Sequence, residues 1–348
     1  MNNAEMSLEV IEVKSDKDWL VDLPVSVTIW TRPDLQREQF EVIKKARPSV
    51  LFLTSDGGRN EKESALIKQS RAVFDEIDWH CVVHKIFWEE NQGMYSASSQ
   101  AGAYKWSFAD RMVLLEDDII PSVSFFSFCK EMLDRYENDL RVLGVCGMNH
   151  EGATEGVDGD YFFSREASIW GMAIWKRTIE NRGFDYSGNS YALNTISDVA
   201  LLNPDFQRRL NGYAKNNVYE GHIAGSEFWY AFDVFAQNQL YVVPAKNMVS
   251  NKGCTSASSH SDELKLLPKG IQRVFNMKIY ELQFPLSHPD FMTPNIRYQK
   301  RVYRIMAVGH PLVKIHRGIS RLLRILRYQG ISAFLNKLSR TMKQSLES

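Results

Sequence analysis

The sequence has few cysteines and no long apolar run. Its four cysteines, in 348 residues, are far apart and form no CxxC pair, so their spacing indicates neither a zinc site nor a disulfide framework. No stretch of about 18 apolar residues is present to span a membrane as a helix. The first residues, MNNAEMSLEVIEVKSDKDW, are polar and acidic and are unlike a signal peptide. We therefore expect a protein of the reducing cytosol.

Acidic residues are almost missing from the C-terminal part of the chain. Residues 291–348 contain twelve Lys or Arg and one acidic residue, Glu347, which is a net charge of +11. The whole chain has a formal net charge of zero, so residues 1–290 carry −11. With 44% hydrophobic residues, the chain is long enough to bury a large core. The sequence thus predicts an acidic globular body with a basic C-terminal extension.

Short apolar runs alternate with amphipathic segments through the first 147 residues. The apolar runs are rich in β-branched residues, which is typical of buried strands, and the segments between them have helical periodicity. Such alternation predicts a parallel sheet covered by helices on both faces, with ligands bound beyond the carboxyl ends of the strands. The expected strands are 24–30, 49–59, 81–88, 112–116 and 142–147, and the expected helices are 35–46, 61–77, 98–108 and 124–137.

Three adjacent carboxylates follow the fourth expected strand. In the stretch RMVLLEDDIIPSVSFF, Glu116, Asp117 and Asp118 come directly after the apolar run 112–115. Two carboxylates at positions i and i+2 of a strand end point the same way and can share a hard divalent cation, with room for waters and a substrate phosphate. The alternative is a solvated turn or a helix N-terminus, where negative charge is favourable. The position at the end of a central strand favours a metal site.

Residues after the other strands limit the classes of enzyme and ligand that fit the sequence. A phosphatase or receiver-type protein needs an aspartate nucleophile after the first strand, but that strand ends in IWTRPD, where Arg32 has the opposite charge. A nucleotidyltransferase needs a Gly-rich basic loop near the N-terminus, and the sequence has none. Arg32 after the first strand suits a phosphate, and Asp56 after the second suits the N–H of a nucleobase. This combination favours a protein that binds a nucleoside diphosphate.

Seven stretches, in order, resemble the GT-A glycosyltransferases. They are WTRPD, TSDGGR, ENQGMYSASSQAGAYKW, LLEDDIIPSVSFFSF, ASIWGMAIWKR, SEFWYAFD and VSNKGCTSASSHS, and they cover roughly residues 24 to 262. They are similar to bacterial family-2-type (hemolytic-protein-like) nucleotide-sugar transferases and to the eukaryotic mannosyl-glycoprotein N-acetylglucosaminyltransferase family. The resemblance implies a GT-A fold, a Rossmann-like α/β architecture with a mixed, mainly parallel sheet. It also implies a metal-dependent sugar transfer.

The resemblance implies a role for several polar residues in these stretches. Asp118 would be the direct ligand of a Mn²⁺ or Mg²⁺ ion, and His260 would ligate the same metal or steady the leaving group. Glu227 would take the proton from the acceptor hydroxyl, with Asp198 as the reserve candidate. The residues expected to bind the donor are Arg32 at the diphosphate or nucleotide, Asp56 at the nucleobase, Asn91 and Gly93 in the loop beside the nucleotide, Glu116 at the ribose or sugar, Asp117 next to it, and Trp170 stacked on a sugar.

Each of these residues also has a purely structural interpretation. Asp56 with the two glycines after it, and Asn91 in its NQG triplet, can be ordinary turns. His260 can be a surface histidine, and Trp170 can belong to the core. Glu227 can be a buried structural residue.

The basic extension contains an amphipathic helical pattern. With about 100° per residue, six aliphatic residues of 312–328 fall on one side and five basic residues on the other, and a second apolar stripe follows Gly330. This pattern is typical of helices that lie in the interface of an anionic membrane. The alternative is a helical pair docked on the catalytic domain, and no nucleic-acid partner is expected because the extension has no recognition motif. The aliphatic set is Leu312, Ile315, Ile319, Leu322, Leu323 and Leu326, and the basic set is Lys314, Arg317, Arg321, Arg324 and Arg327.

Together these observations predict an N-terminal segment (1–22), a GT-A catalytic domain (23–265) and a basic amphipathic helical extension (266–348). The expected activity is inverting sugar transfer from a nucleotide-sugar donor to a glycan or lipid-linked acceptor in bacterial surface-polysaccharide synthesis. A UDP-sugar is favoured, and UDP-GlcNAc is one candidate. The expected location is cytoplasmic, peripheral at the inner face of the cell membrane. Two alternatives remain: a retaining transferase on the same fold, and a non-catalytic protein that binds membranes or glycans.

Overall fold

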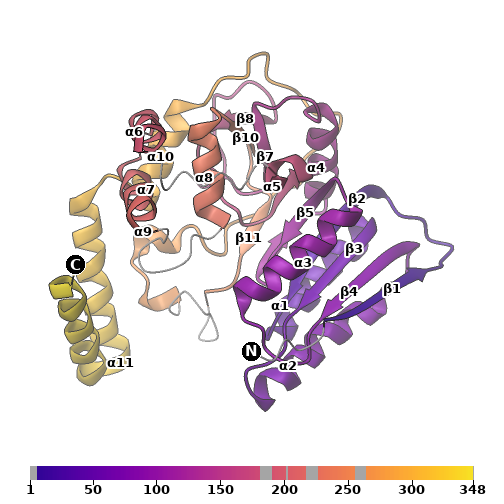
Figure 1. Ribbon diagram of the computed structural model, residues 1–348, viewed down its shortest axis with the longest axis horizontal. Helices are drawn as coiled ribbons and strands as arrows, with labels where there is room; N and C mark the ends of the chain where they lie inside the picture. Colours follow the sequence, from indigo (N-terminus) through magenta and orange to yellow (C-terminus); the bar gives the residue numbers. More distant parts are fainter. Residues whose placement is uncertain (1–5, 181–189, 201–202, 217–225, 255–263, 348) are drawn as a thin grey trace.

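The computed structural model (Figure 1) describes residues 6–180, 190–200, 203–216, 226–254 and 264–347; of the side chains, those of Ser190, 211–216, Ser226 and 340–347 are not described. Within these residues, the main sheet has nine strands in the order β1-β4-β3-β2-β5-β9-β7-β10-β8, and a small sheet pairs β6 with β11. Strands β4, β3, β2, β5, β7 and β10 run in one direction and β1, β9 and β8 in the other. The sheet is therefore mixed but mainly parallel, as predicted.

The strands are short and deeply buried except at the edge formed by β1. Alternate residues of each strand point to opposite faces, so a strand that is buried throughout needs apolar residues on both. Their bounds are β1 Ser7–Val13, β2 Val21–Ile29, β3 Pro48–Ser55, β4 Cys81–Phe87, β5 Arg111–Leu115, β6 Ile119–Pro121, β7 Val142–Cys146, β8 Tyr161–Ser164, β9 Met172–Trp175, β10 Leu240–Pro244 and β11 Val249–Asn251.

Different helices cover the two faces of the main sheet. Leu53 of β3 packs in the large core cluster together with Phe40 of α1, whereas its neighbour Phe52 packs on the other face with Ala101 of α3. The alternation predicted from the sequence is thus a three-layer α/β arrangement. The helices are α1 Pro33–Ala46, α2 Glu61–Ala72, α3 Met94–Phe108, α4 Ser124–Arg135, α5 Lys176–Glu180, α6 Ser190–Val199, α7 Pro204–Asn216, α8 Ser226–Ala236, α9 Lys269–Gln272, α10 Ile296–Met306 and α11 Pro311–Glu347, with 3₁₀ turns η1 Val73–Glu76 and η2 Leu264–Leu266.

Every strand and helix predicted from periodicity up to residue 147 is present, with shifted ends. The helix expected over 61–77 ends at Ala72 and continues as the 3₁₀ turn η1. The helix expected over 98–108 begins earlier, at Met94. Its first turns carry mostly exposed side chains, so there was no apolar stripe from which periodicity could detect the start.

The packed body extends beyond both ends of the segment 23–265. At the N-terminal end, β1 pairs antiparallel with β4 along the whole strand, from Ser7 opposite Phe87 onward. At the C-terminal end, α10 places Tyr298 and Val302 in the same core cluster as the central strands. The basic extension is therefore divided: its first part completes the body, and only α11 stands apart from the core.

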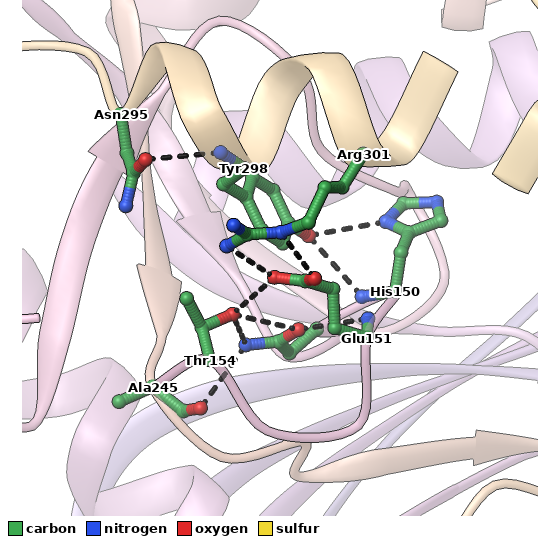
Figure 2. Close-up of polar contacts among 8 residues, drawn as sticks. His150, Glu151, Thr154, Ala245, Asn295, Tyr298 and Arg301 are labelled. Carbon is green, nitrogen blue, oxygen red and sulfur yellow. Dashed lines mark hydrogen bonds and ion pairs between the residues drawn. The ribbon is translucent and has the colours of Figure 1, made fainter. Parts of the chain in front are cut away.

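Buried polar contacts hold α10 to the loop after β7 (Figure 2). The Tyr298 hydroxyl accepts the backbone N–H of His150 at 3.1 Å and lies 3.2 Å from Nδ1 of the same residue. Burial lowers the pKa of His150 to about 4, so its ring is neutral at pH 7. Arg301 donates to Glu151 at 2.9 Å, and Asn295 caps the helix by accepting the Tyr298 N–H at 3.0 Å.

The last helix, α11, has a sharp break at Gly330. This residue has φ 86° and ψ 179°, a combination that is essentially restricted to glycine. Figure 1 shows α11 on the opposite side of the body from β1 and β4, near α7 and α9. None of the described helices is both long and apolar enough to cross a membrane.

The role of α10 in the folded body can be tested by removing one oxygen atom. Tyr298→Phe leaves the buried N–H of His150 without its acceptor and is expected to lower the free energy of unfolding by about 1–3 kcal/mol in urea denaturation. Tyr191→Phe is the control, because Tyr191 is 81% exposed and such changes stay within about 0.5 kcal/mol. An unchanged urea midpoint for Tyr298→Phe would contradict the assignment of α10 to the core.

Candidate active site

The polar strand ends identified in the sequence meet at one edge of the main sheet. Strand β2 pairs in parallel with β3, with Ile29 opposite Ser55, and with β5, with Val27 opposite Leu115. The residues that follow these strands are therefore neighbours, as expected for the carboxyl ends of parallel strands. They include Arg32, Asp56 and the three carboxylates from Glu116 to Asp118.

Arg32 bridges two of the three carboxylates. Its Nη1 donates to both oxygens of Asp117, at 3.0 and 3.1 Å, and to Oδ2 of Asp118, at 2.9 Å. The three side chains are only 10%, 13% and 15% exposed. Nε of Arg32 and Oδ1 of Asp118 are buried and have no hydrogen-bond partner. The bridge thus leaves one buried donor and one buried acceptor for partners that lie outside the described residues or belong to a ligand.

Negative charge is crowded at this edge of the sheet. Burial raises the pKa of Asp117 to about 6 although Arg32 opposes the shift, and burial also raises the pKa of Asp118. The pKa of Glu116 is raised to about 8, first by removal from bulk water and then by the charges of the two aspartates and Glu227. The Glu116 side chain is nevertheless exposed, so solvent screening weakens the shift. A bound cation would reverse all three shifts, because it favours the ionised forms.

A hard divalent cation fits this set of donors. Carboxylate oxygens are the ligands that Mg²⁺ and Mn²⁺ prefer, and one or two carboxylates together with waters and a phosphate are sufficient. Asp118 has the buried Oδ1 that lacks a partner. Among the described residues, no group of three or more His, Cys, Asp and Glu side chains could hold a metal ion by itself. The protein would therefore supply few ligands, with Asp118 first among them.

A buried glutamine holds the turn that carries the carboxylates. Gln39 of α1 is fully buried, and its Nε2 donates to the backbone oxygens of Glu116, at 2.8 Å, and Ile119, at 2.7 Å. Its Oε1 accepts from Nε2 of Gln36, also fully buried, at 3.0 Å. Sequence reasoning missed both glutamines. A signal was present, because two amides three residues apart near the apolar stripe of a helix need buried partners.

A second segment reaches the carboxylates from β11. This strand pairs with β6, and directly after it Lys252 donates its backbone N–H to the backbone oxygen of Asp118 at 2.9 Å. A Cβ atom on Gly253 would lie 1.8 Å from Oδ2 of Asp118, so only glycine fits beside this carboxylate. Sequence reasoning did not single out Gly253. His260, the other predicted metal ligand, lies in 255–263 and is outside the described residues.

Donors of the protein itself occupy the hydrogen-bond acceptor positions of the Asp56 carboxylate. Its Oδ1 accepts the N–H groups of Gly57 and Gln92, both at 2.8 Å. Its Oδ2 accepts Nδ2 of Asn91 and the N–H of Gly93, both at 3.0 Å. A carboxylate offers about four acceptor positions, and these bonds fill them. Asp56 therefore positions the loop of Asn91 and Gly93, and its contact with a nucleobase stays a prediction that needs one of these bonds to be exchanged.

The other predicted residues lie on three separate elements. Glu227 is in the first turn of α8 with an exposed side chain, close enough to Glu116 for its charge to raise that pKa. Asp198 is exposed on α6, whose apolar side packs with that of α8. Trp170 is half-buried and packs on Phe275, with ring centroids 5.3 Å apart. The geometry thus brings Glu227 near Glu116 and gives Trp170 a packing role, while the stacking of Trp170 on a sugar stays a prediction.

Comparisons with known proteins give no family assignment. No family model and no curated protein matches the chain. Among solved structures, TarS of S. aureus (residues 1–349) aligns with a TM-score of 0.35 and 10% identity over 66% of this chain and 59% of TarS. An apo UDP-glucose pyrophosphorylase aligns with a TM-score of 0.28 and 10% identity over 62% of this chain and 81% of that one. With TM-scores this low, neither likeness bears on what this chain does.

The close contact at Gly253 leads to a test of the predicted metal ligand. Gly253→Ala would push the Asp118 carboxylate out of its place and is expected to weaken Mn²⁺ binding, measured by isothermal titration calorimetry, by about 10- to 100-fold. Gly102→Ala is the matched control, because nothing lies near a Cβ atom added there. If Gly253→Ala and Gly102→Ala bind Mn²⁺ equally well, the position of the Asp118 carboxylate does not matter to the ion.

Proposed function

We propose that this chain is a metal-dependent glycosyltransferase that moves a sugar from a nucleotide-diphosphate donor to an acceptor hydroxyl, with inversion at the anomeric carbon. The observation that carries the proposal is the bridge from Arg32 to Asp117 and Asp118, with Nε of Arg32 and Oδ1 of Asp118 both buried and left without a partner. A diphosphate offers an acceptor oxygen to Nε of Arg32, and its divalent cation offers a positive charge to Oδ1 of Asp118. This match favours a metal–diphosphate over a simple anion or a bare cation.

In the proposed reaction, the acceptor hydroxyl attacks the anomeric carbon from the side opposite the diphosphate. The new C–O bond forms while the bond from the anomeric carbon to the diphosphate oxygen breaks, and Glu227 receives the hydroxyl proton. Arg32 stays on the two aspartates through Nη1 and offers its other N–H groups to the leaving diphosphate, whose negative charge grows. A divalent cation bound at Asp118 would add positive charge at the same leaving group.

The donor is proposed to be a UDP-sugar, with UDP-GlcNAc as one candidate. The nucleotide would lie beside the loop of Asn91 and Gly93, which Asp56 holds in place. The imide N–H of uracil can replace one of the four N–H groups that Asp56 accepts. Glu116 would contact the ribose or the sugar. The proposed acceptor is a glycan or a lipid-linked glycan in bacterial surface-polysaccharide synthesis, on the cytoplasmic side of the membrane.

Two alternative functions are compatible with the same set of residues. A retaining transferase would give the opposite anomeric configuration and would not need Glu227 as a base. A non-catalytic glycan- or membrane-binding protein would not turn over a donor. The exposed position of Glu227 in the first turn of α8, near the exposed Glu116, favours the inverting enzyme, because an acceptor can reach it there.

A screen of nucleotide-sugars with Mn²⁺ tests the proposal directly, with release of UDP, GDP or dTDP as the signal. Asp118→Asn is expected to abolish this release while the fold stays intact, because a neutral amide is a poor ligand for a hard cation. The control is Asp158→Asn, an exposed carboxylate in the loop before β8. A variant Asp118→Asn that works within about tenfold of wild type would refute the metal assignment.

The proposed base can be separated from the donor site by kinetics. Glu227→Gln is expected to reduce kcat by roughly 10² to 10⁴ with donor affinity nearly unchanged, since the amide cannot accept the hydroxyl proton. Asp198→Asn, on the neighbouring helix α6, tests the reserve candidate in the same assay and should leave kcat unchanged if Glu227 is the base. A large loss of donor affinity with normal kcat would move Glu227 into the donor site, and loss of activity in Asp198→Asn instead would make Asp198 the base.

A further inference from the structure

The first part of α11 is attached to the body by basic side chains. Lys314 pairs with Asp205 of α7 at 2.6 and 2.7 Å. Arg317 donates to the backbone oxygen of Ile305 at 2.8 Å, and Arg324 donates to the backbone oxygen of Lys265 at 2.9 Å. A water-soluble amphipathic helix normally does the opposite, with its apolar side on the body and its charged side in solvent.

The aliphatic side of α11 is consequently turned outward. Most of the stripe expected from the sequence is exposed, and Leu322 is half-buried. Ile325 points the other way and is buried. We call the exposed set the aliphatic row; it consists of Leu312, Ile315, Ile319, Leu323 and Leu326, which are 78%, 60%, 55%, 58% and 38% exposed. In the alternative to a membrane helix, α11 is docked on the catalytic domain. The structure shows the first part of α11 attached to the body, but through its basic side and not through the aliphatic stripe.

Apolar side chains remain exposed beyond the break in α11. Gly330 ends the first arm, and the second arm begins with Ile331, 68% exposed, followed one turn later by Leu335, 54% exposed. Several exposed aliphatic side chains on one side of a helix are uncommon on proteins that work free in solution, and they mark a surface that meets a partner.

We propose that the aliphatic row is the contact surface for an anionic lipid membrane, with α11 lying in the interface rather than crossing it. Aliphatic side chains enter the boundary between headgroups and acyl chains, and basic residues beside them meet the lipid phosphates. Arg327, exposed next to Leu326, is placed for this role. The charge favours lipid over a second copy of the chain, because two copies packed row to row would bring together two segments of net charge +11.

The membrane contact also bears on the acceptor of the proposed reaction. Where the proposed transferase function holds, the membrane contact favours a lipid-linked acceptor. The membrane contact itself does not depend on that function, because lipid binding is measured without any donor.

The test is co-sedimentation with vesicles of phosphatidylglycerol and phosphatidylethanolamine and with vesicles of phosphatidylcholine alone. Full-length wild type is expected to bind the anionic vesicles and to bind less as salt is raised. The double variant Ile319→Glu, Leu323→Glu should bind at least tenfold more weakly. The matched control Leu140→Glu, Phe291→Glu adds the same charge at positions that are 66% and 75% exposed elsewhere, and should bind like wild type.

Each result decides the proposal. All four substituted positions are exposed, so circular dichroism and melting temperature should match wild type in both variants. Equal vesicle binding by the two double variants, or no binding by wild type, overturns the membrane contact. A wild-type dimer in sedimentation velocity that Ile319→Glu, Leu323→Glu converts to monomer, without vesicle binding, overturns it in favour of a second copy. If wild type binds the vesicles but shows no transfer activity, only the enzymatic proposal is contradicted.

Discussion

The neutralisation of three neighbouring carboxylates at the end of β5 is the constraint around which this site is built. Arg32 supplies one positive charge to Asp117 and Asp118, and removing such a partner from a buried pair typically destabilises a protein by about 3–5 kcal/mol. One guanidinium cannot neutralise three ionised carboxylates, and burial raises the pKa of each of them because it disfavours the charged form. A further cation would favour the ionised forms, so a site of this kind is suited to bind one.

Much of the surrounding structure serves the position of these groups. The amide of Gln39 fixes the backbone of the turn from inside the helix layer, and Gly253 allows a second strand to pass close to Asp118. Arg32 contacts the aspartates only through Nη1, so its other N–H groups remain for a ligand. Its Nε is buried and has no acceptor among the described residues. Arg32 is thus placed to connect the carboxylates with a bound anion, which neither a lysine nor a metal-bound water would do with the same geometry.

Local patterns in the sequence were sufficient for the central strands, their helices and the position of the carboxylates, because apolar periodicity and strand ends are local properties. The parts of the site that depend on distant contacts were not predictable in this way. Gln39 meets Glu116 across 77 residues of sequence. Asp56 was expected to face a ligand, but three groups 35 to 37 residues away, together with the N–H of the adjacent Gly57, fill its acceptor positions. A motif identifies the residues of a site. Which of their hydrogen-bond donors and acceptors remain available to a ligand depends on chain segments that the motif does not contain.

Contacts with distant segments also decide how the C-terminal helix α11 is oriented on the body. An amphipathic pattern defines two sides of a helix and does not say which side meets the body. That choice depends on the acceptors that the body offers. Here they are a carboxylate, Asp205, and two backbone oxygens, of Ile305 and Lys265, all of which suit basic side chains. Because the body presents these acceptors next to the place where Ile325 is buried, the basic side of α11 faces the body and its aliphatic row is left for a surface outside the chain.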